Sequence, residues 1–222
     1  RPYQTAFWGR QALAATTPDQ LKNSFGEAIK LGGFPLSEVY RVVTDALVNN
    51  SRARTKEWDE VTTLTEKELE KFLVKEPLDP RFFIRLGKLY NDHAFVKAQL
   101  LSDAERVLLR AKELAPNRPD SYYEIGVTYL QAGQNDRALK VFEEALNLNP
   151  RNSRGRWSLG LAHVIVGHNA EGAAIMEEAI KQGYAWTSQA DVNNLVQTYN
   201  LLKRFDKIVG VCIAVIHRTN DN

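Results

Sequence analysis

Cysteine and methionine are almost absent from this sequence, with one of each among 222 residues. The single Cys212 excludes an intramolecular disulfide and a metal site built from several cysteines. No apolar run approaches the roughly 20 residues that span a bilayer, so we expect no direct membrane insertion by this segment. Proline and glycine are also scarce, at 8 and 13 residues, which argues against extended disorder and predicts a folded chain.

Excess charge of either sign is lacking as well. The 29 basic and 27 acidic residues leave a formal net charge of +2, which gives no electrostatic reason to expect a nucleic-acid partner. The sequence opens on Arg1-Pro2-Tyr3 rather than on a methionine or a secretory signal. We interpret it as a soluble mature or excised fragment, whose localisation these residues leave unknown.

Residues that could take part in catalysis or metal binding are few and are scattered along the sequence. The closest two histidines, His163 and His168, are five positions apart, which is a poor spacing for joint metal ligation on one helix face. Cys212 lies between Val211 and Ile213, so we expect a buried small hydrophobe rather than a nucleophile. There is no phosphate-binding glycine loop and no HExxH motif. The sequence therefore predicts no catalytic residue, no metal, no cofactor and no enzyme activity of its own.

A repeated pattern takes the place of catalytic motifs. Between Asp120 and Pro150, two amphipathic segments flank Gly133, as expected for two helices joined by a turn. A shift of 34 residues aligns small and apolar positions of this unit with those of the next: Gly126 with Gly160, Gly133 with Gly167, Glu143 with Glu177 and Ala145 with Ala179. This period and these residue types resemble the tetratricopeptide repeat family.

The resemblance implies an all-α fold, a right-handed α-solenoid of about six helix pairs, of which the first two and the last are degenerate. We divide the chain into degenerate repeats over 1–79 and a solenoid over 80–222, continuous with the first part. The solenoid units are 80–118, 119–152, 153–188 and 189–222, and an insertion is expected at about 91–101. Gly126 and Gly160 are expected where paired helices cross too closely for a side chain.

The first third of the chain fits the pattern more loosely. Thr17-Pro18-Asp19-Gln20 is typical of a helix start, and Gly32-Gly33 of a helix end, so we predict a helix over 18–31. Further helices are predicted over 36–48 and about 65–74. The thirteen charged residues of 51–76 are interpreted as a solvated helix face, with a binding patch as the alternative.

In the tetratricopeptide family the first helices of the repeats line a concave groove, which implies a scaffold that binds a protein or peptide there. Tyr123 and Trp157 are the expected anchors, with packing between repeats as the alternative, and Arg81, Lys88 and Arg154 would attract acidic groups. Asn193, Gln197 and Asn200, toward the carboxyl-terminal end, are also predicted to line the groove, and the alternative is that these amides are simply solvated. The full set of predicted groove residues is Arg81, Ile84, Lys88, Tyr123, Val127, Leu130, Arg154, Trp157, Leu161, Val164, Asn193, Gln197 and Asn200.

A second resemblance rests on shorter motifs. Arg1-Pro2-Tyr3, Phe25-Gly26-Glu27-Ala28-Ile29 and Lys75-Glu76-Pro77-Leu78-Asp79-Pro80 are similar to the tail that follows the last membrane helix in O-antigen ligase or polymerase-like proteins. This resemblance implies an alternative function in polysaccharide assembly. The chain would then be an accessory domain of a membrane glycosyltransferase, tethered to a bacterial inner membrane, with the catalytic part outside this sequence.

The last predicted helix is apolar on nearly every side. Residues 205–217 include Ile208, Val211 and Ile213, and no polar helix follows to cover them. Terminal repeats usually need a polar outer face. The sequence therefore suggests that 205–217 is covered by self-association with another copy or by residues outside this sequence, against the alternative that the repeat itself buries enough of this surface.

Overall fold

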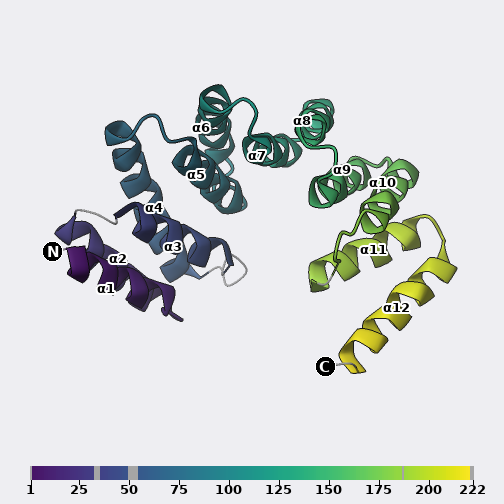
Figure 1. Ribbon diagram of the computed structural model, residues 1–222, viewed down its shortest axis with the longest axis horizontal. Helices are drawn as coiled ribbons and strands as arrows, with labels where there is room; N and C mark the ends of the chain where they lie inside the picture. The colour runs from purple at the N-terminus through teal and green to yellow at the C-terminus, as the bar shows by residue number, and fades with distance from the viewer. Residues whose placement is uncertain (1, 33–35, 50–54, 187, 221–222) are drawn as a thin grey trace. The chain divides into compact units, whose positions relative to one another are not determined.

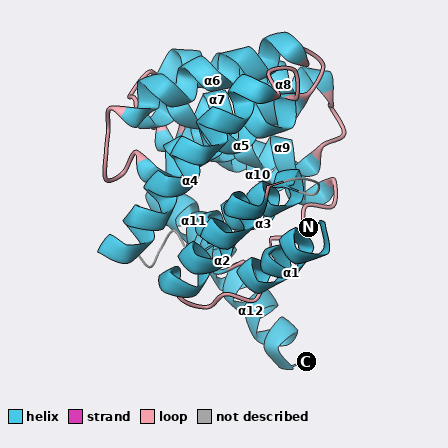
Figure 2. Cartoon of the chain, turned by 90° about the vertical axis from the view of Figure 1, so that its left-hand side faces the viewer, coloured by secondary structure: helices cyan, strands magenta, loops and turns pink. Residues whose placement is uncertain are grey.

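The computed structural model describes residues 2–32, 36–49, 55–186 and 188–220. These residues form twelve α-helices and, within the same ranges, no β-strand (Figures 1 and 2), which confirms the predicted all-α fold of helix pairs. The chain divides into two compact units, Arg1–Pro116 and Asn117–Asn222. The division predicted from the sequence, at residues 79 and 80, lies inside the first of these units.

Unit 1 contains six helices. They are α1 (Pro2–Leu13), α2 (Pro18–Leu31), α3 (Leu36–Asn49), α4 (Lys56–Lys75), α5 (Pro80–His93) and α6 (Leu100–Leu114). Helix α2 has its predicted bounds because the Thr17 hydroxyl accepts a hydrogen bond from the Gln20 backbone N–H, and Gly32 ends the helix at a φ of 61°. Residues 94–99 connect α5 to α6 and lie within the segment 91–101 where the insertion was predicted.

A chain of aromatic rings holds unit 1 together. Phe25 of α2 packs on Tyr40 of α3 with ring centroids 5.7 Å apart, and Tyr40 packs on Phe72 of α4 at 5.0 Å. Phe72 then meets Phe82 of α5 at 4.8 Å. Ring contacts of this geometry add to the free energy gained by burying the apolar area. Helices α2 to α5, which lie on both sides of the predicted boundary at residues 79 and 80, therefore share one core.

Helix α4 is longer than the sequence suggested, since it begins at Lys56 rather than near Thr65. The charge pattern predicted that the charged side chains of this segment would all be solvated, but some of them are not. Glu66 is buried, and its Oε1 lies 2.8 Å from Nδ1 of His93 in α5. The Tyr90 hydroxyl donates to Glu70 Oε1 at 2.5 Å. Two acidic side chains of the charged run thus join α4 to α5, while Arg52 and Arg54 lie outside the described residues.

Unit 2 contains three helix pairs: α7 (Pro119–Gln131) with α8 (Asn135–Leu148), α9 (Ser153–Ile165) with α10 (Asn169–Lys181), and α11 (Gln189–Leu201) with α12 (Phe205–Asn220). The two glycines predicted at helix crossings do lie there. A Cβ at Gly126 would be 2.6 Å from the Phe142 ring of α8. A Cβ at Gly160 would be 2.9 Å from the Gly172 carbonyl oxygen of α10, so these backbones are in direct contact.

Candidate functional site

The apolar part of the predicted groove lies on α7 and α9, the first helices of the first two helix pairs of unit 2. These two helices contact each other. Val127 and Leu130 of α7, and Leu161 and Val164 of α9, are half-buried. Each side chain therefore leaves part of its apolar area open to solvent after the helix pairs have packed. Such partly exposed apolar side chains on neighbouring helices are the common feature of surfaces that take up a peptide.

The polar part lies on α11. Asn193, Gln197 and Asn200 are exposed, and Gln189 Nε2 donates to Asn193 Oδ1 at 2.9 Å. The spacing of these three amides, four and three residues, places them on one face of the helix. An amide can donate and accept, so this row can bind the backbone of an extended segment.

Tyr123 of α7 packs at the joint between two repeats and is partly buried. Its ring centroid lies 6.2 Å from that of Phe142, and its hydroxyl accepts a hydrogen bond from Asn152 Nδ2 at 3.3 Å. Burial raises the pKa of the Tyr123 hydroxyl above its usual value. Gly155 of α9 makes room for this hydroxyl, because a Cβ there would collide with it. Tyr123 thus combines the predicted groove position with the packing role that was its alternative.

Trp157 is not an exposed anchor, contrary to the sequence-based prediction. Only 4% of its surface is accessible, and its ring stacks on that of Tyr184 with centroids 4.6 Å apart. It belongs to a core cluster with Met176 of α10 and with Leu195 and Tyr199 of α11. The repeat register places Trp157 on the first helix, but the following repeat covers the ring. The packing alternative is therefore the right one for this residue.

Charged and polar groups surround this core. Arg154 of α9 is exposed. The Tyr184 hydroxyl donates to Asp191 Oδ1 at 3.0 Å. Burial, and then this hydrogen bond to Asp191, raise the pKa of Tyr184 to about 12, while Arg154 acts in the opposite direction. The loop that carries Tyr184 lies outside the helical register, which is why the sequence analysis did not assign it a role.

The remaining predicted groove residues belong to α5, in unit 1. Ile84 is half-buried, and Lys88 and Arg81 are exposed. The Arg81 guanidinium is paired with Asp79, with 2.7 Å between Nη2 and Oδ2. This ion pair at the start of α5 already neutralises a charge that the sequence had assigned to ligand attraction.

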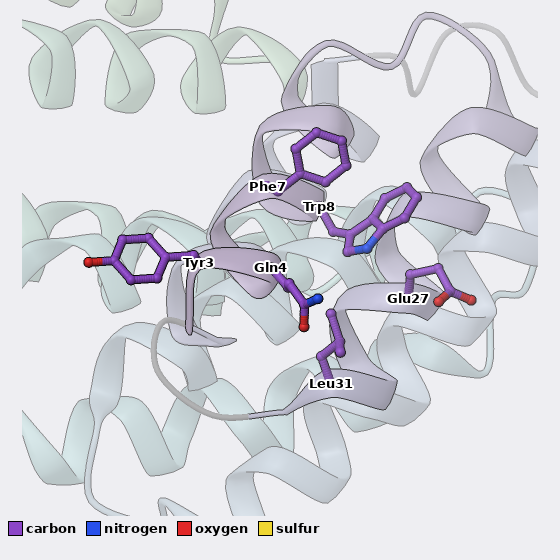
Figure 3. A pocket seen from close by; sticks show the side chains of 6 residues that line it. All are labelled: Tyr3, Gln4, Phe7, Trp8, Glu27 and Leu31. Carbon is purple, nitrogen blue, oxygen red and sulfur yellow. The ribbon is translucent and has the colours of Figure 1, made fainter. Parts of the chain in front are cut away.

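A pocket that sequence reasoning missed lies between α1 and α2 (Figure 3). Its volume is about 470 Å³, and it is lined by Tyr3, Gln4, Phe7, Trp8, Glu27 and Leu31. The Phe7 and Trp8 rings meet edge to face at 5.2 Å, whereas the Tyr3 ring points away from the other five side chains. The Glu27 carboxylate is paired with Lys30 at 2.6 Å. The lining is chiefly aromatic and aliphatic, and the only signal in the sequence was the local density of aromatic residues.

The outer side of α12 is open. Four large apolar side chains on it are between 49% and 60% accessible, namely Phe205, Val209, Ile213 and Ile216. Their spacing of four, four and three residues makes one stripe along the helix. Cys212 is exposed, so the prediction that it is buried was wrong. The cause is that only one side of α12 packs on its own repeat, where Val211 is buried.

Two histidines that were expected to lie apart are close together. Ligand atoms of His163, His168 and Glu171 all lie within 4.8 Å of one another. His163 lies in the last turn of α9, His168 is the N-cap residue of α10, and the turn between the two helices brings them together. Their spacing in the sequence was judged for a single helix, and that assumption was wrong.

Comparison with known proteins identifies the helix pair at the centre of the chain. Residues 119–152, which span α7 and α8, match the tetratricopeptide repeat. The chain carries a tetratricopeptide repeat. These bounds are those predicted for the second solenoid unit, and no curated protein matches the sequence.

Solved structures show that the tetratricopeptide fold extends beyond that repeat. TTC0263, a tetratricopeptide protein of Thermus thermophilus, is similar with a TM-score of 0.64 and 17% identity, over 91% of this chain and 99% of that one. PilF of Pseudomonas aeruginosa is similar at 0.57 and 13%, over 99% and 94%. MamA of AMB-1 is similar at 0.54 and 20%, over 81% and 97%. At these identities the similarity concerns the fold.

A tetratricopeptide repeat supports, in general, a scaffold that binds other proteins. The predicted resemblance to O-antigen ligases receives no support from these comparisons. Among the described residues, the helices are too short or too polar to cross a bilayer.

Proposed function

We propose that the tetratricopeptide pairs of unit 2 form a scaffold that binds an extended or helical protein segment along the first helices α7, α9 and α11. The observation that supports the proposal is the group of half-buried apolar side chains on α7 and α9, which leave part of their apolar area accessible. Val127, Leu130, Leu161 and Val164 provide the apolar contacts, and Tyr123 contributes the open part of its ring. Trp157 supports this surface from beneath and does not touch the ligand.

The chemistry of the bound segment follows from the side chains around the apolar group. Apolar residues at helical or extended spacing would contact α7 and α9, and the row of amides on α11 would bind polar groups of the segment. Arg154 is exposed beside this surface and favours acidic groups. In unit 1, Ile84 and Lys88 of α5 are proposed as a separate contact surface of that unit, whereas Arg81 is paired with Asp79.

Site-specific photo-cross-linking tests the proposal on the full chain. A benzophenone amino acid is placed at Val127 or at Leu161, and the matched control is Lys140, an exposed position on the second helix α8. The first two positions should form covalent adducts with a protein segment, and Lys140 should form few. Adducts that form mainly from Lys140 would instead assign binding to the second helices.

The segment identified in the adduct is then synthesised and its affinity measured by fluorescence anisotropy. The change Val127→Gln with Leu161→Gln should weaken binding about tenfold or more, or ~1.4 kcal/mol, because apolar contacts at the centre of an interface carry most of the affinity. The change Arg154→Gln should mainly lower the association rate and its dependence on salt. Unchanged affinity of the double variant would refute the assigned surface.

A further inference from the structure

The turn between α9 and α10 brings three potential metal ligands to one point. Gly167 adopts a φ of +95°, and the His168 backbone N–H donates to the His163 carbonyl at 2.8 Å. This bond reverses the chain sharply, so that His168 lies beside the last turn of α9. The Gly172 N–H donates to the His168 carbonyl at 2.9 Å and starts α10. Glu171, three residues after His168, then lies on the same side of α10.

His163 contributes a buried and unsatisfied nitrogen. The residue is 5% accessible, and its Nδ1 has no hydrogen-bond partner among the described residues. The Glu171 carboxylate lies close to this nitrogen, with 3.4 Å between Nδ1 and Oε2. A buried polar atom without a partner is unfavourable, so in native proteins it calls for a specific explanation such as an ion that binds there.

The neighbouring repeats show that the turn itself does not need this arrangement. In the preceding pair, Gln134 N–H donates to the Tyr129 carbonyl at 2.8 Å in the same way. There the Arg137 guanidinium lies over the Tyr129 ring, 4.0 Å from its centroid, and donates to the Tyr129 hydroxyl at 2.6 Å. The three positions that correspond to His163, His168 and Glu171 are thus filled by an aromatic ring, an amide and a cation that satisfy one another.

The following pair repeats that solution. Arg204 N–H donates to the Tyr199 carbonyl at 2.9 Å, and the Arg204 guanidinium lies 5.6 Å from the Tyr199 ring centroid. Arg204 and Lys207 also pair with Glu177, at 3.2 and 3.3 Å. Only the middle turn of unit 2 combines two imidazoles with a carboxylate and has no cation at these positions.

We propose that His163, His168 and Glu171 bind a divalent transition-metal ion of the Zn²⁺ class at the α9–α10 turn. Imidazole nitrogen and carboxylate oxygen are ligands that Zn²⁺ and its neighbours in the first transition series accept, whereas Mg²⁺ and Ca²⁺ prefer oxygen alone. Three protein ligands leave a fourth position for water or for a group from a partner. The metal would hold the end of α9 to the start of α10.

The distances fit a site that closes on the ion. With metal–ligand bonds of about 2.0–2.2 Å, ligand atoms of a tetrahedral site lie about 3.4 Å apart. The His163 Nδ1 to Glu171 Oε2 distance of 3.4 Å already has this value. The other separations, up to 4.8 Å, must shorten. His168 and Glu171 are exposed and can rotate toward His163, which is held by its burial.

Metal binding is tested on the full chain, without an affinity tag and after treatment with a chelator. Co²⁺ is the spectroscopic probe and Zn²⁺ the calorimetric one. The expected result is one equivalent of either ion per chain, visible d–d absorption bands for Co²⁺, and a higher Tm with Zn²⁺.

Two variants of exposed ligands, His168→Gln and Glu171→Gln, should each weaken Zn²⁺ binding about tenfold or more, since loss of even an indirect partner of a metal site has effects of that order. His217→Gln is the matched control, because it removes an exposed histidine from α12 and should leave binding unchanged. His163 is left intact because its burial makes any substitution a risk to folding.

Three outcomes would overturn the proposal. The wild-type chain could show no Co²⁺ absorption bands and no stabilisation by Zn²⁺, in which case His163 and Glu171 form an ion pair only. His217→Gln could reduce binding as much as His168→Gln, which would mean non-specific binding to histidines. Finally, the two ligand variants could retain full affinity while far-UV circular dichroism confirms that they are folded.

Discussion

Replacement of Gly160 by alanine should destabilise the chain, although alanine is the better helix former. In the middle of a helix, Gly→Ala by itself adds about 1 kcal/mol of stability. At Gly160 a Cβ would lie 2.9 Å from the Gly172 carbonyl oxygen and 2.9 Å from the Met176 backbone nitrogen. The reciprocal contact is equally tight, since a Cβ at Gly172 would lie 2.6 Å from the Gly160 carbonyl oxygen.

A Cβ at Gly160 would also lie 2.7 Å from Cγ of the Met176 side chain, which can rotate away. The Gly172 oxygen and the Met176 nitrogen belong to the backbone, so no rotation of a side chain can relieve the overlap with them. Overpacking usually costs about 1–3 kcal/mol, and a crossing that must widen belongs at the upper end. With the gain in helix propensity subtracted, we expect Gly160→Ala to lower the free energy of unfolding by about 2 kcal/mol.

Gly210 of α12 provides the matched control within unit 2, because a Cβ there would meet nothing within 4 Å. Gly210→Ala should therefore raise stability by up to about 1 kcal/mol. Urea unfolding followed by far-UV circular dichroism compares the two variants with the wild type. If Gly160→Ala is as stable as the wild type, α9 and α10 do not cross as closely as described, and the reasoning is refuted.

The remaining predictions concern packing, association and pH. Gly126→Leu should cost about 2 kcal/mol or more in urea unfolding because its side chain would enter the space of a neighbouring ring, and unchanged stability would contradict the crossing. Trp157→Ala should lower the free energy of unfolding by about 3–5 kcal/mol and unfold unit 2, because the ring is buried. A fully folded variant that has lost only ligand binding would instead show that Trp157 is an anchor for the ligand. If the chain self-associates through the exposed apolar side chains of α12, Val209→Glu with Ile213→Glu should make it monomeric in sedimentation experiments. A wild-type chain that is monomeric at all concentrations would contradict this prediction. Burial and then the Glu177 carboxylate raise the pKa of Tyr199 to about 12 from 10.0, so its contribution to stability is complete below pH 10 and is lost as the pH rises toward 12. Unfolding at several pH values should show this loss in the wild type and less of it in Tyr199→Phe.

The helices and their pairing were predictable because they depend on local signals. Thr17 and Pro18 start α2 where a capping hydroxyl and a fixed φ favour it, and the glycine after Leu31 ends it. The 34-residue register placed Gly126 and Gly160 at crossings, since a repeated helix pair requires a small residue at the same point each time. Helix α4 was less predictable, because its first two turns carry charged residues without an apolar period.

The candidate site was only partly predictable. The repeat register identified the first helices and hence Val127 and Leu161, which remain partly accessible. It could not show that Tyr184, from a loop outside the register, would stack on Trp157 and close it off. A register fixes the face of a helix on which a residue lies, but the amount of solvent it meets depends on what the next element brings.

By itself, then, the sequence determined which segments are helical, where paired helices approach closely and which residues share a face, because these properties follow from neighbours a few positions away. Tertiary structure alone decided which of those residues remain accessible. Trp157 is buried, and Cys212 is exposed because only one side of α12 packs on its repeat. Ligand atoms of His163, His168 and Glu171 lie within 4.8 Å of one another. The reason is that the turn at Gly167 and the packing of α9 on α10 bring these side chains close together. Their separation along the sequence does not determine their distance in space.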